Sequence, residues 1–124
     1  MRYAPLIGVL VIVGCFPQVT VTPLTRTTFA EVSDTTIVPV LETDKPDCPF
    51  REVAAITATD GGRFTREEIR AAIIVQARRL GANGIIRFAV YSSPARSGPN
   101  GMPVGELTNY SGIAVLFTQR GCTR

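Results

Sequence analysis

Three thiols, Cys15, Cys48 and Cys122, are the most reactive side chains of this sequence, which contains no histidine. A catalytic cysteine or serine is commonly activated by a histidine base, so neither a Cys/His nor a Ser/His/Asp centre is expected. Without imidazole, these thiols also form a poor ligand set for zinc or copper. The sequence therefore predicts lipid or disulfide chemistry at the cysteines, and no enzyme activity, metal site or cofactor.

Cys15 stands at the end of an apolar N-terminal stretch. After Arg2, residues 4–13 are uncharged and mostly aliphatic. This stretch is shorter than the roughly 20 residues of a membrane-spanning helix, and it indicates a signal sequence. No A-x-A cleavage site is present, and Ile12-Val13-Gly14-Cys15 resembles the bacterial lipobox. We expect residues 1–14 to be a lipoprotein signal peptide, with a buried cysteine in an apolar helix as the alternative.

Lipidation of Cys15 would attach diacylglycerol to the thiol and a further acyl chain, such as palmitate, to the freed amine. Several chains anchor a protein stably where one holds it only marginally. The predicted location is the cell envelope, facing the periplasm. Phe16 directly after Cys15, in place of Asp, favours the outer membrane over the inner one. Export argues against nucleic acid as a partner.

Lipidation of Cys15 leaves an even number of thiols, Cys48 and Cys122. In an oxidising compartment, two remaining cysteines are more often a disulfide than a metal site. We expect a Cys48–Cys122 bond in the mature protein, and two unpaired cysteines are the alternative.

Basic residues gather in the second part of the chain. Residues 48–124 carry ten arginines and five acidic residues. Arg63, Arg66 and Arg70 follow the turn sequence Asp60-Gly61-Gly62 at the start of a predicted helix, where backbone N–H groups can hold an anion. They are candidate anion-binding residues, for a lipid headgroup or a glycan. The alternative is a tight turn followed by a solvated helix surface.

The elements that position these residues follow from hydrophobic periodicity. Residues 51–59 predict a strand, and Thr65 with Glu68 forms a capping box that opens a helix ending at Gly81. Strands are predicted over 83–91 and 110–118, joined by a loop from Ser92 to about Thr108. The fold class is α+β, with one sheet of three to four strands packed on a single helix in the order strand, helix, strand, loop, strand. The apolar helix face comprises Ile69, Ala72, Ile73, Ala77 and Leu80.

The residues after Cys15 lack helical periodicity. We expect residues 15–35 to be the lipidated cysteine and a flexible tether, in which residues 27–32 could add a strand. A random coil of that length would place the domain on the order of 25 Å from the bilayer. Residues 36–124 form the predicted domain, beginning with a short edge strand over 36–41 that contains Pro39.

Both faces of the predicted sheet are apolar. Strict alternation places one set of side chains on the helix: Ile86, Phe88, Val90, Ile113, Val115 and Phe117. The opposite set would be Ile85, Ala89, Tyr91, Ala114 and Leu116, interrupted by Arg87. We expect Ile85, Arg87, Tyr91 and Leu116 to form a partner face, covered by an envelope protein or a second copy of the chain. Cover by residues 36–41 of the same chain is the alternative.

The succession "REVAAITAT", "AAIIVQARRLGANGII" and "YSGIAVLF" resembles small exported bacterial domains typified by the Rcs stress-sensor lipoprotein of enterobacteria. It is also similar to a related family loosely labelled heavy-metal-binding. The resemblance covers roughly residues 37–118 and implies a small exported α+β domain. The sensor lipoprotein's four cysteines do not match the positions in this chain, so its disulfides and specific partners are not implied.

These observations predict a lipid-anchored envelope protein that acts as a non-enzymatic sensing or protein-interaction module. The alternative is a binder of an anionic envelope ligand through the arginine-rich surface.

Overall fold

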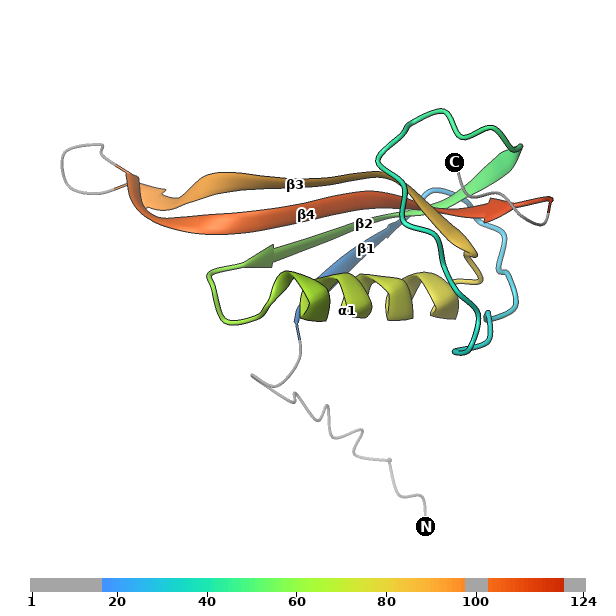
Figure 1. Cartoon of the computed structure of the whole chain (residues 1–124), viewed down its shortest axis with the longest axis horizontal. Helices are drawn as coiled ribbons and strands as arrows, with labels where there is room; N and C mark the ends of the chain where they lie inside the picture. The colour runs from blue at the N-terminus through green and yellow to red at the C-terminus, as the bar shows by residue number, and fades with distance from the viewer. Residues whose placement is uncertain (1–16, 98–102, 120–124) are drawn as a thin grey trace, which may run out of the picture.

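Four strands form one antiparallel sheet in the order β1-β2-β4-β3, and a single helix lies along one face of it (Figure 1). The computed structural model describes residues 17–97 and 103–119. The elements are β1 (Val19–Pro23), β2 (Phe50–Asp60), α1 (Arg66–Arg79), β3 (Gly84–Ser97) and β4 (Pro103–Phe117). The predicted α+β class, with one sheet and one helix, is confirmed. The predicted signal peptide, Cys15 and Cys122 lie outside the described residues.

The ends of α1 are fixed by the predicted residues. Thr65 Oγ1 accepts a hydrogen bond from the Glu68 backbone N–H at 3.1 Å, and the Glu68 carboxylate accepts one from the Thr65 N–H at 3.3 Å. At the other end Gly81 has φ +82°, a conformation that favours glycine. Ile69, Ile73 and Ala77 are buried against the sheet, as the periodicity predicted.

The predicted tether is wrong, because part of it belongs to the sheet. Residues 19–23 form β1 and pair with β2 from Val19↔Ala58 to Pro23↔Ala54. The residues 27–32 form no strand. Val19 and Val21 pack against the helix-side core, while Thr20 and Thr22 point to the other face. The domain therefore begins before residue 36.

The predicted loop over 92–108 is also wrong, because β3 and β4 continue through most of it as a hairpin. The pairing extends to Ser97↔Pro103. Pro94 is accommodated because β3 is an outermost strand of the sheet. There, the N–H that proline lacks is not needed for a hydrogen bond to a neighbouring strand. In Figure 1 the hairpin extends beyond the N-terminal end of α1.

A β-bulge in β3 exchanges the two predicted sheet faces. Ile86 pairs with Ile113 and Ala89 with Ser111, so Arg87 and Phe88 together oppose one residue of β4. Arg87 adopts φ +53°. One extra residue reverses the direction of every later side chain. Consequently the residues of β3 before the bulge and those after it, which were predicted to share a face, lie on opposite faces of the sheet.

The helix-side core contains Ile85 together with Phe88, Val90 and Leu116. Ile85 is fully buried, and Leu116 is partly buried against the same cluster. The prediction that Ile85 and Leu116 lie on a partner face opposite the helix is therefore wrong. Tyr91, which is 55% exposed, and Arg87 remain on the surface.

The outer face, opposite α1, has an apolar end and a polar remainder. Ile86, Val115 and Phe117 are buried there beneath Leu41 and Cys48, so the chain covers this end itself. Elsewhere Thr20 and Thr57 are exposed and paired across the strands. The expectation of a largely apolar outer face is therefore wrong, because the apolar end is covered by the chain and the remainder is polar.

Residues 24–49, the connecting segment, run from β1 past the C-terminal end of α1 to β3 and then to β2 (Figure 1). Arg78 holds this segment: its guanidinium donates to the Thr36 carbonyl, and its own carbonyl accepts from the Val32 N–H at 2.9 Å. Further along, the segment pairs in parallel with β3 through a Val40↔Ile85 bridge. The expected edge strand over 36–41 is therefore reduced to this bridge. In the described part of the chain, no helix has the length and apolarity needed to span a membrane.

Candidate functional site

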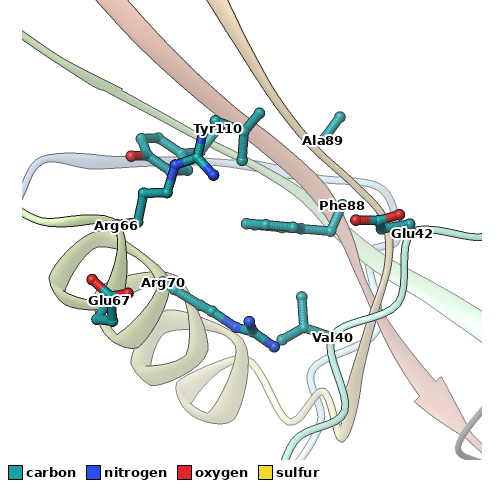
Figure 2. A pocket seen from close by; sticks show the side chains of 9 residues that line it. Val40, Glu42, Arg66, Glu67, Arg70, Phe88, Ala89 and Tyr110 are labelled. Carbon is teal, nitrogen blue, oxygen red and sulfur yellow. The ribbon is translucent and has the colours of Figure 1, made fainter.

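A groove of about 690 Å³ lies between the N-terminal half of α1 and the middle of β3. We call it the α1–β3 groove. Figure 2 shows that α1, β3, β4 and the connecting segment all contribute side chains to it. The lining residues are Val40, Glu42, Arg66, Glu67, Arg70, Phe88, Ala89, Val90 and Tyr110.

Arg66 and Arg70 form the helix wall of the groove. Arg66 is the first residue of α1, immediately after the Thr65 cap, and Arg70 follows one turn later. At 1.5 Å of rise per residue, the two positions are separated by about 6 Å along the axis. Both side chains are exposed, and neither makes a hydrogen bond or an ion pair with another described residue. The capping box thus places two cations with unused donors on one wall.

The floor of the groove is apolar. Phe88 and Val90 are half-buried and pack against the helix-side core, as does Val40 from the connecting segment. Phe88 has this position because the Arg87 bulge turns it toward α1. In Figure 2 the Phe88 ring lies between the helix and β3. A ligand could therefore combine apolar contact with charge.

The acidic residues of the groove lie apart from each other. Glu42 comes from the connecting segment and is near Phe88 in Figure 2, whereas Glu67 lies on α1. Glu67 and Arg70, three residues apart, make no ion pair. The helix wall therefore carries two positive groups and one negative group, and Glu42 adds a second negative group at the end of the groove formed by the connecting segment.

Arg63, the third predicted anion-binding residue, does not line this groove. The amides of its turn are already used: Asp60 accepts hydrogen bonds from the Arg63 N–H at 3.0 Å and the Phe64 N–H at 3.3 Å. Asp60 is 7% exposed and is the only buried charged side chain among residues 17–94 and 105–119. The turn is therefore stabilised by its own carboxylate, which would repel an added anion.

No protein-family model, curated protein or solved structure matches this chain. The resemblance to the envelope sensor lipoproteins consequently stays a prediction.

Of the three cysteines, the structure describes only Cys48. Cys48 is half-buried and disulfide-bonded. Since Cys15 and Cys122 are not among the described residues, the pairing of Cys48 with Cys122 stays a prediction. In the described segments, no three His, Cys, Asp or Glu side chains gather to form a metal site.

Sequence reasoning found Arg66 and Arg70 but missed the rest of the groove. Val40 and Glu42 belong to an irregular segment that has no periodicity to predict where it packs. Phe88 was correctly predicted to face the helix, but the prediction assumed strict alternation from Ile86. The bulge at Arg87 breaks that alternation. The alternation of Val and Thr over 19–22 was a usable signal for β1.

Proposed function

We propose that this chain is a non-enzymatic protein-interaction module of the bacterial cell envelope, anchored by a lipid at Cys15. Its α1–β3 groove binds an acidic part of a partner protein. The lipobox-like residues 12–15 and the disulfide-bonded Cys48 support an exported location, because disulfides persist mainly in oxidising compartments. An outer-membrane position, facing the periplasm, is part of this proposal.

The observation that carries the binding role is the pair Arg66 and Arg70, which have no partner in the described chain and stand over an apolar floor. Guanidinium groups bind carboxylates through two parallel hydrogen bonds. An exposed ion pair contributes only about 0–1 kcal/mol, so two such pairs alone give weak binding. Contact with Phe88 and Val90 supplies the further apolar burial, at roughly 25 cal/mol per Å².

An anionic lipid headgroup or glycan is the alternative ligand, since the same guanidinium groups bind phosphate. Two features favour a protein. The floor is apolar, and Glu42 at one end of the groove would repel a densely charged surface. The two ligand classes are separated by identifying what contacts the groove in cells.

A photo-cross-linking residue at Glu67, which is exposed on the groove, would test the proposal in the organism that encodes the chain. The same residue at Thr57, exposed on the outer face, is the positional control. We expect a discrete protein adduct at position 67 only, reduced at least tenfold by the double substitution Arg66→Gln and Arg70→Gln.

Arg63→Gln with Arg79→Gln removes the same charge outside the groove and should leave the adduct unchanged. Adducts with lipid or glycan alone would refute a protein partner and favour the alternative. Equal loss in both double variants would show that net charge, and not the groove, determines binding.

A further inference from the structure

The outer edge of β3 is occupied along only part of its length. The connecting segment bonds to it through four backbone hydrogen bonds of 2.8–2.9 Å, between residues 39–43 and residues 85–88. The last of these runs from the Phe88 N–H to the Leu41 carbonyl. No described segment pairs with this edge after Phe88.

The backbone direction along this edge follows from alternation. Successive residues of a strand direct their N–H and C=O groups to opposite edges. Since Phe88 donates outward to the connecting segment, Val90 and Ser92 also direct their backbone groups outward. Pro94 has no N–H and ends the series. A short free edge therefore remains at residues 90–92.

This free edge borders the α1–β3 groove, because Phe88, Ala89 and Val90 line it. Side chains of an added strand alternate between the two sheet faces, and those on the helix side would face Arg66 and Arg70. Residues two apart on a strand are separated by about 6.6–6.8 Å. The two arginines are separated by about 6 Å along α1. The spacings match closely enough for two alternate acidic residues.

We propose that the free edge of β3 accepts an extended segment of the partner as an additional strand, with the pattern acidic-x-acidic. The acidic side chains bind Arg66 and Arg70, while the backbone pairs with Val90 and Ser92. This inference rests on the proposed function and specifies how the partner is recognised. Strand addition is a recurrent mode of peptide binding, in which main-chain hydrogen bonds give affinity and side-chain pockets give specificity.

Charge complementarity selects an acidic partner segment over a second copy of this chain. Residues 88–94 of β3 contain no acidic side chain, so a second β3 would bring none to Arg66 and Arg70. It would instead bring a second pair of arginines to the same junction. Glu42, at the end of the groove nearest the connecting segment, disfavours a third acidic residue there.

A synthetic peptide tests the inference with the full chain purified in a neutral detergent. The probe is an N-acetylated, C-amidated Thr-Val-Glu-Val-Glu-Val-Thr. One control replaces both glutamates by glutamine, and a second carries N-methyl groups on the amides that would face β3. We expect each control to bind at least tenfold more weakly. We also expect slower hydrogen exchange at the Val90 and Ser92 amides when the unmodified peptide is bound.

Ser92→Pro removes an outward N–H and should weaken peptide binding about tenfold, whereas Ser92→Ala retains the N–H and should not. If Ser92→Pro fails to fold, the N-methylated peptide and the exchange measurement still decide. Binding that requires the glutamates but is indifferent to N-methylation would overturn strand addition and leave the proposed groove function intact.

Absence of binding by the unmodified peptide at millimolar concentration would also overturn the inference, while the cross-link from position 67 tests the groove function separately. Protection of Val90 and Ser92 without peptide, together with a dimer in light scattering, would show that a second copy occupies the edge.

Discussion

Gly81→Ala tests whether the connecting segment is a fixed part of the domain. Gly81 follows the end of α1 with φ +82°, and the backbone of residues 29–30 passes directly against it. A Cβ at this position would lie 2.4 Å from Phe29 Cβ and 2.7 Å from the Ala30 carbonyl oxygen. Both distances are shorter than van der Waals contact, so the segment or the helix end must move.

Gly62→Ala is the matched control, because Gly62 has φ +97° but no atom within 4 Å of its Cβ position. The left-handed conformation costs a residue with a Cβ roughly 1–2 kcal/mol. A less flexible unfolded chain offsets about 0.4–1 kcal/mol of this cost. We expect Gly62→Ala to lower the free energy of unfolding by about 1 kcal/mol. Gly81→Ala should lose a further 1–3 kcal/mol or so through overpacking.

Urea denaturation followed by circular dichroism measures this difference. With a slope of about 2 kcal/mol per molar urea, an extra loss of about 2 kcal/mol separates the two midpoints by about 1 M. Equal midpoints for the two variants would refute the reasoning, because they would show that residues 29–30 do not pack against the helix end.

The remaining predictions concern the core and the cysteines. Ile85→Glu should abolish cooperative unfolding, because it buries an unpaired charge. Tyr91→Glu should change the free energy of unfolding by under about 0.5 kcal/mol. Thermal melts of both variants test this, and a folded Ile85→Glu variant would contradict the face assigned to Ile85. Cys48→Ser should cost roughly 4 kcal/mol if Cys48 closes a loop of about 75 residues with Cys122, and alkylation of two thiols in the folded, unreduced protein would exclude that bond. Cys15→Ala should prevent fatty-acid labelling and normal processing, and an unlabelled wild type would refute lipidation.

The elements that local chemistry determines were predictable. Thr65 and Glu68 satisfy orphan helix donors within four residues of sequence, and Gly81 ends the helix through a backbone conformation that other residues avoid. The strands β2, β3 and β4 were recognisable from their β-branched and aromatic content, although β3 and β4 extend further than expected. Such signals need no knowledge of distant contacts.

The sheet faces were not predictable in the same way. The bulge lies at Arg87, which adopts φ +53° although no glycine, asparagine or proline there signals it. One such residue inverts the alternation and moves Ile85 from the expected outer face to the helix-side core. The groove was only half predictable for a related reason. Arg66 and Arg70 follow from helix spacing, whereas Glu42 is brought to the same groove by the long-range pairing of an irregular segment.

The position of β1 limits how far the domain can stand from an anchoring membrane. Val19, the first residue of β1, comes four positions after Cys15. Even fully extended, four residues span at most about 14 Å. A lipid at Cys15 would therefore hold the first residue of β1 within about 14 Å of the attached lipid, whereas a long flexible tether would let this distance vary. A partner that binds near the start of β1 would therefore have to approach within about this distance of the bilayer surface.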